Sequence, residues 1–117
     1  MPLERRQQKN ENSSTRKGNP GESLLIIGLL TLELFFSQSE SLKDKRRLLK
    51  SIIDQIKARF NVSVAEAGEQ DKWQLSLLAV VAVSNDSAYV NGILSSVEDF
   101  VERMGKAEIL SVKTELR

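Results

Sequence analysis

The sequence predicts one α+β domain with the element order β-α-β-β-α-β, and this prediction rests on two periodicities and the chain length. Four segments are predicted to be strands: residues 25–36, 61–67 and 108–116 show a period of two in their side chains, and residues 74–84 are apolar on both faces. Two longer segments, residues 42–60 and roughly 85–104, repeat apolar residues every three or four positions, as amphipathic helices do. The 117 residues have the length of a single domain.

Residues 1–22 are predicted to be a disordered tail in front of the domain, which spans residues 23–117. The tail has almost no apolar side chains, so it cannot bury enough surface to offset the entropy lost on folding. A glycine- and proline-containing breaker at residues 18–21 separates the two parts. No apolar run follows the arginines of the tail, which argues against a signal peptide. The apolar segment 24–36 is short and contains Glu33, which argues against a membrane span.

The first strand and the first helix follow this tail. In the strand, the even positions from 30 to 36 are uniformly apolar, whereas the odd positions are mixed. Ser41 is a suitable N-cap for the helix, with Asp44 three residues later, and Asn61 is a suitable stop. The apolar stripe of the helix consists of Leu48, Leu49, Ile52, Ile53, Ile56 and Phe60.

The second and third strands are predicted to form a hairpin. The polar loop 68–72 joins them, and Trp73 begins the return strand. Residues 74–84 are apolar at odd and even positions alike, which indicates a central strand that is covered on both sides.

The second helix and the last strand complete the domain. Ser84, Asn85 and Asp86 are candidate N-caps of the helix, and Gly105 is a suitable C-terminal cap. Gly92 within the helix costs up to about 1 kcal/mol relative to alanine, which hints at close packing there. The element order predicts a four-stranded antiparallel sheet with both helices on one face and with the first and third strands in its centre.

The absence of cysteine and histidine restricts the chemistry of this chain. Without cysteine there are no disulfides, so nothing points to secretion, and a cytoplasmic location is expected. Thiolate and imidazole metal sites, histidine-activated nucleophiles and histidine acid–base pairs are all excluded. We therefore expect a protein that is not an enzyme, with no catalytic residues, no metal site and no cofactor.

Four separated motifs occur in a fixed order within residues 25–116. They are Ser41-Leu42-Lys43-Asp44-Lys45-Arg46-Arg47 with Leu49-Lys50 following, Arg59-Phe60-Asn61-Val62-Ser63-Val64-Ala65-Glu66, Gln70-Asp71-x-Trp73-Gln74 and Val83-Ser84-Asn85. In this order they resemble the YlxP-like family of small bacterial proteins, which is classed as a domain of unknown function. The resemblance implies a ferredoxin-like fold and a bacterial cytoplasmic protein, often encoded near genes for translation initiation and ribosome maturation. It implies no activity and no cofactor, and the N-terminal tail departs from the family pattern.

A basic cluster at the start of the first helix is the sharpest feature: Lys43, Lys45, Arg46, Arg47 and Lys50. Cations at such short spacings repel one another and oppose the dipole at a helix N-terminus, so folding alone favours acids there. We therefore expect the cluster to contact rRNA, ribosomal particles or another polyanion. The alternative interpretation is a solvated helix face without a partner.

The sheet face without helices is predicted to be partly apolar, since Ile27, Leu29 and Phe35 point toward it. Monomeric proteins rarely expose large apolar patches, so a homo-oligomer formed through this open face is expected. The alternative is that the tail or the chain ends cover the face. Phe35 is the only plausible exposed ring on the first strand, which is too little for the aromatic platform of an RNA-binding sheet.

A possible second surface lies at the hairpin and comprises Glu66, Asp71 and Trp73. With Glu69, the two carboxylates form the only acidic group worth testing for acid–base or metal chemistry, but no helper residue accompanies them. Solvated loop acids are the simpler interpretation. Trp73 is expected to be a core or interface anchor rather than a stacking group.

Taken together, these features predict a non-catalytic, RNA- or ribosome-associated binding module of bacterial translation or ribosome maturation. The alternative is a homo-oligomeric scaffold or regulatory protein that binds a protein partner or a small ligand, an inference that rests on analogy of fold alone. No membrane partner is expected.

Overall fold

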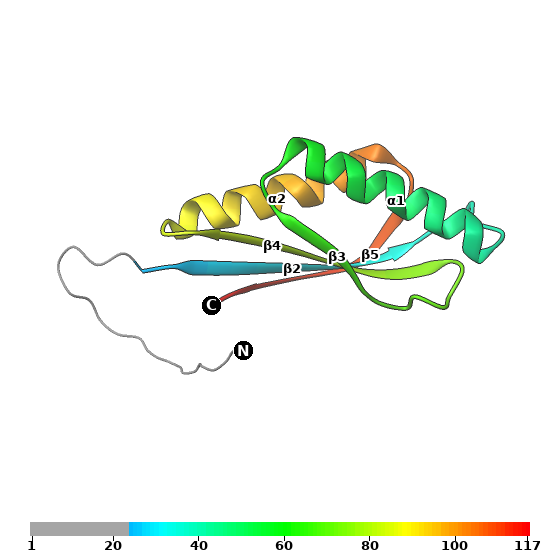
Figure 1. Cartoon of the computed structure of the whole chain (residues 1–117), viewed down its shortest axis with the longest axis horizontal. Coiled ribbons are helices and arrows are strands. Elements are labelled where there is room, and N and C mark those ends of the chain that lie inside the picture. Colours follow the sequence, from blue (N-terminus) through cyan, green and yellow to red (C-terminus); the bar gives the residue numbers. More distant parts are fainter. Residues whose placement is uncertain (1–23) are drawn as a thin grey trace.

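Two helices pack against one side of a four-stranded antiparallel sheet in the computed structural model, which describes residues 24–117 (Figure 1). The predicted tail, residues 1–22, lies outside the described residues. The elements are β2 (Ile26–Phe35), α1 (Leu42–Arg59), β3 (Ser63–Gly68), β4 (Leu75–Ser84), α2 (Ser87–Met104) and β5 (Glu108–Leu116). The strand order is β3-β4-β2-β5, so the first and third strands are central, as predicted. This arrangement is the predicted ferredoxin-like fold.

Helix α1 begins with the predicted cap. The Oγ of Ser41 accepts a hydrogen bond from the amide of Asp44 at 3.0 Å, and Oδ2 of Asp44 accepts one from the amide of Glu40, also at 3.0 Å. The first of these bonds satisfies an amide that the helix start would otherwise leave unpaired. The helix ends one residue earlier than predicted, because Phe60 already has an extended backbone.

Helix α2 uses Asp86, one of its three predicted caps. Its Oδ1 accepts hydrogen bonds from the amides of Ala88 and Tyr89 at 3.0 and 3.3 Å. The helix ends at Gly105, whose φ of 69° lies in the left-handed region that glycine adopts without steric cost.

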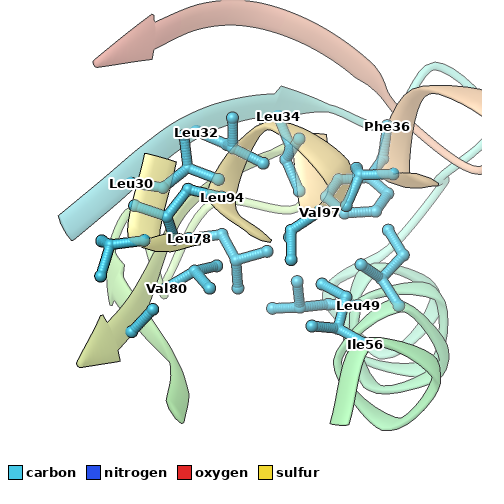
Figure 2. Close-up of a cluster of buried hydrophobic side chains, with 14 residues drawn as sticks. Leu30, Leu32, Leu34, Phe36, Leu49, Ile56, Leu78, Val80, Leu94 and Val97 are labelled. Atoms are coloured by element: carbon cyan, nitrogen blue, oxygen red, sulfur yellow. The ribbon is translucent and has the colours of Figure 1, made fainter. Parts of the chain in front are cut away.

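The core lies between the sheet and the helices (Figure 2). The even positions of β2 and β4 point into it, and the apolar stripes of α1 and α2 cover them, as the helical period requires. Its buried residues are Leu30, Leu32, Leu34, Phe36, Leu49, Ile52, Ile56, Leu78, Val80, Ala82, Val90, Leu94, Val97 and Val101.

Strand β4 is central, but the prediction that both of its faces are covered is wrong for the described residues. Both helices lie on one side of the sheet (Figure 1). The buried even positions of β2 and β4 face the helices, and the odd positions form the open face. Ile27 and Val83 are paired opposite each other there and are 45% and 58% exposed. Leu29 and Phe35 on the same face are half-buried. The open face therefore carries an apolar patch at the end of the sheet where β2 begins.

Close packing of α2 occurs at Gly28 of β2 and not at Gly92. A Cβ added at Gly92 would meet no atom within 4 Å, so the sequence-based hint of close packing there is wrong. A Cβ at Gly28 would lie 2.8 Å from Cδ1 of Leu94 and closer still to Cγ1 of Val90. Both of those side chains belong to the buried core, so the missing side chain at Gly28 is what lets α2 approach the sheet.

Alanine substitutions at these two glycines are expected to have opposite effects on the free energy of unfolding. Gly92→Ala should raise it by up to about 1 kcal/mol, because alanine is the better helix former and the site is open. Gly28→Ala should lower it by about 1–3 kcal/mol, because the added methyl group overpacks the core. Urea denaturation at constant m-value measures both, and a Gly28→Ala protein as stable as the parent would contradict the packing described here.

Candidate functional site

Lys45 separates from the rest of the basic cluster because its side chain is fully buried beneath α1. Its Nζ donates hydrogen bonds to the carbonyls of Glu69 and Leu75 at 2.8 and 2.9 Å. It also lies 3.2 Å from Oε2 of Glu66, so each of the three N–H groups of the ammonium has a close acceptor, and the carbonyl of Gln70 lies farther away at 3.4 Å. Lys45 therefore has no exposed atom to offer a polyanion, and its assignment to the binding surface is corrected.

The carboxylate of Glu66 is part of the same buried network. Its Oε2 accepts a hydrogen bond from Oγ of Ser76 at 2.8 Å in addition to its contact with Lys45. Glu66 lies on β3 and Ser76 on β4, so the network joins both strands of the hairpin to α1. The carboxylate of Glu66 therefore has a structural role, in which it links α1, β3 and β4.

Hydrogen bonds to main-chain carbonyls fix the loop between β3 and β4. Glu69 adopts a φ of 62°, a region that side chains other than glycine rarely occupy, and its carbonyl is held by Lys45. At the other end, Oγ of the buried Ser39 donates to the carbonyl of Trp73 at 2.6 Å. The amide of Phe36 donates to the carbonyl of Gln74 at 2.8 Å. The loop is thus held from α1 and from the end of β2.

The other four members of the cluster are exposed on α1. Arg47 lies 3.8 Å from Oδ1 of Asp44, and Lys50 lies 2.7 Å from Oδ2 of Asp54. Lys43 and Arg46 form no ion pair with any residue from 24 to 117. Exposed pairs of this kind contribute under about 1 kcal/mol, so all four cations remain available to a stronger anionic ligand.

Exposed basic side chains also occur near the C-terminal end of α1. Lys57 and Arg59 are also exposed, and the guanidinium of Arg59 lies 5.0 Å from the ring centre of Phe100. Helix α1 therefore presents six exposed cations and two carboxylates, whereas its neighbour α2 carries three carboxylates and one arginine. The basic surface, which we define as Lys43, Arg46, Arg47 and Lys50, lies at the N-terminal half of α1.

A shallow hollow of about 190 Å³ lies beside the basic surface, between α1 and β3. Its apolar lining comes from α1, and two members of the basic surface are at its rim. The lining residues are Arg46, Leu49, Lys50, Ile53 and Glu66.

The structure does not bring the predicted second surface together. Glu66 lies under α1 on the helix side of the sheet, whereas Asp71 and Trp73 lie at the end of the open face. Trp73 is 47% exposed, so it is not a core anchor. Trp73 lines a second hollow of about 370 Å³, which we call the aromatic hollow. The lining residues of the aromatic hollow are Phe35, Asp71, Lys72, Trp73, Gln74 and Leu75.

Sequence reasoning missed the structural role of Lys45, although a signal for it was present. Lys45 precedes Leu49, Ile52 and Ile56 by four, seven and eleven residues, which places it on the buried stripe of α1. A lysine that lies in the first turn of a helix and on its apolar stripe indicates an acidic partner inside the protein. Glu66, an acid in a predicted strand, was a candidate for that partner.

Two further observations concern residues 24–117 as a whole. No group of three or more acidic side chains there is arranged to hold a metal ion. Neither helix is long and apolar enough to cross a membrane.

The element order and the strand order define the class of this protein as a ferredoxin-like βαββαβ domain. The chain belongs to the family described as "Protein of unknown function (DUF503)", whose family model matches residues 27–114. It is 33% identical over 90 residues to the "Uncharacterized protein YlxP" of Bacillus subtilis (strain 168), a match that covers 77% of this chain and 98% of that protein. The resemblance predicted from the four motifs is therefore confirmed.

Among solved structures, the chain is similar to two designed proteins. One is the de novo designed protein Foldit4, with a TM-score of 0.48 and 17% identity, covering 79% of this chain and 97% of that one. The other is the de novo designed protein LFR1 1 with ferredoxin fold, with a TM-score of 0.46 and 12% identity, covering 80% and 86%.

The role of Lys45 predicts a large difference between two lysines of the same helix. Lys45→Met should lower the free energy of unfolding by about 3–5 kcal/mol, because it leaves Glu66 as a poorly solvated charge without a partner. Lys50→Met removes an exposed ion pair and should cost under about 1 kcal/mol. Urea denaturation measures both variants, and equal effects at the two positions would contradict the buried network.

Proposed function

We propose that this protein is a non-catalytic binding module that contacts single-stranded RNA, of ribosomal or other origin, through the basic surface on α1. The observation that carries the proposal is the exposure of Lys43, Arg46, Arg47 and Lys50 on one helix, two of them without an ion-pair partner among the described residues. A role in bacterial translation or ribosome maturation, inside the cytoplasm, is part of the same proposal.

The energetics of α1 support a partner for these cations. Lys43 lies in the first turn, where the helix dipole disfavours positive charge, and Arg46 and Lys50 are four residues apart and repel each other. Lys45 has an internal reason to be basic, because Glu66 needs a counter-charge. Lys43 and Arg46 have no such counter-charge among residues 24–117, and phosphate groups match them in charge and hydrogen bonding.

Charge reversal at Lys43 and Arg46 distinguishes an effect on RNA binding from an effect on folding stability. The double variant Lys43→Glu/Arg46→Glu should lose most of its affinity for single-stranded RNA, while its free energy of unfolding stays equal or rises by up to about 1 kcal/mol, because acids suit a helix N-terminus. Fluorescence anisotropy with a labelled oligonucleotide at low salt measures binding. The affinity of the parent should fall steeply with salt, with a log–log slope of roughly 0.7 per phosphate contact.

A matched control carries the same change in net charge elsewhere. Arg103→Glu/Lys113→Glu alters one exposed arginine on α2 and one exposed lysine on β5. The control should bind RNA almost as the parent does, apart from a small long-range effect. Equal loss in the two double variants would mean that only overall charge matters, and it would remove the assignment to α1.

A second function is favoured by the apolar patch at the start of β2. Ile27 and Val83 are exposed beside each other, and Leu24 and Leu25 just before the strand are 57% and 69% exposed. A second copy of this chain docked on the patch would remove these side chains from water. The protein would then be a homo-oligomeric scaffold as well as a binding module.

Self-association through this patch is expected to be sensitive to a single charge. Val83→Lys should shift the protein toward the monomer without unfolding it, because the side chain points away from the core. Sedimentation velocity over a range of concentrations measures the effect. A parent protein that is monomeric at all concentrations would rule out this interface.

A further inference from the structure

We propose that the aromatic hollow at the far end of the open face binds one unpaired base of the RNA strand, with Trp73 as the stacking surface. This inference rests on the proposed function, because the base belongs to the strand whose phosphates contact α1. The observation behind it is the juxtaposition of Trp73 and Phe35 around a hollow of about 370 Å³. Partly buried hydrogen bonds hold the loop that carries Trp73.

The exposure of Trp73 has no structural explanation among the described residues. The side chain is 47% exposed, although its backbone is anchored by Ser39 and its neighbours by Lys45 and Phe36. A rigid backbone that presents a large aromatic ring to solvent is pre-organised for a ligand, since little entropy remains to be lost on binding. Phe35 and Leu75 form the apolar part of the lining.

The chemistry of the rim matches a nucleotide better than a purely apolar ligand. Lys72 supplies a cation for a phosphate, and its ammonium lies 3.5 Å from the carboxylate of Glu69, an exposed pair that a phosphate can replace. Asp71 supplies a carboxylate, which accepts hydrogen bonds from exocyclic amino groups such as N4 of cytosine. Stacking on tryptophan is open to every base.

The aromatic hollow and the basic surface lie at the same end of the molecule. Lys45 in the first turn of α1 contacts the carbonyls of Glu69 and Gln70, and Ser39, just before the helix, contacts the carbonyl of Trp73. Lys43 and Arg46 flank that buried lysine along the chain. One strand can therefore pass from the cations of α1, around the hairpin loop, to the open face.

The single tryptophan of this chain makes the test direct, because its fluorescence reports on the hollow alone. The parent protein is titrated with a short single-stranded oligocytidylate and, separately, with an abasic strand that has the same phosphates. Both strands should bind by anisotropy, but only the oligocytidylate should quench Trp73. Trp73→Leu should lower the affinity for oligocytidylate on the order of tenfold or more. It should leave the affinity for the abasic strand unchanged.

Tyr89→Leu is the matched control, because Tyr89 is the other strongly exposed aromatic residue of the described chain, at 50%, and lies on α2. It should leave both affinities unchanged.

Oligocytidylate binding without quenching, and with equal affinity in Trp73→Leu, would overturn the base site while leaving the α1 proposal intact. Failure of both strands to bind would overturn the α1 proposal and the base site with it. If the Trp73→Leu protein were more monomeric than the parent and bound RNA with unchanged affinity, the aromatic hollow would instead be a contact with a second copy of this chain.

Discussion

A single buried ammonium group organises the end of the molecule where α1 begins. Nζ of Lys45 connects α1 to β3 through the carboxylate of Glu66 and to the hairpin loop and β4 through the carbonyls of Glu69 and Leu75. Removing a lysine from water is costly, and here the cost is offset because each N–H group has an acceptor and one acceptor carries the opposite charge. Lys45 holds the start of the loop and Leu75, whereas Ser39 and the amide of Phe36 hold the segment around Trp73.

The basic residues of α1 have different roles because Lys45 is buried and the others are exposed. Lysine at position 45 neutralises a carboxylate inside the protein, whereas Lys43 and Arg46 on the solvent side have no such partner among the described residues. Five neighbouring cations that look alike in the sequence thus have two physical roles, which burial alone distinguishes. The helix that supports the loop is also the helix that presents the positive charge, so a ligand that spans both would contact one rigid unit.

Much of the fold was predictable because strand and helix periods are local properties of the sequence. The alternation from Leu30 to Phe36, the cap at Ser41 and the stop at Gly105 are all confirmed. The positions that sequence reasoning placed wrongly depend on contacts between distant segments: the close approach of α2 falls at Gly28 rather than Gly92, and Lys45 points inward to Glu66. The aromatic hollow was also beyond prediction, because Phe35 and Trp73 lie far apart in the sequence and meet only through the pairing of β2 with β4.

An NMR titration of the isotope-labelled protein with oligocytidylate tests the central claim that α1 and the hairpin loop form one binding surface. We expect the amide signals of residues 43–50 and the indole N–H signal of Trp73 to shift together, over the same range of RNA concentration, while α2 and β5 stay unchanged. Shifts confined to α2 and β5, or a Trp73 signal that stays in place while α1 responds, would contradict a common surface.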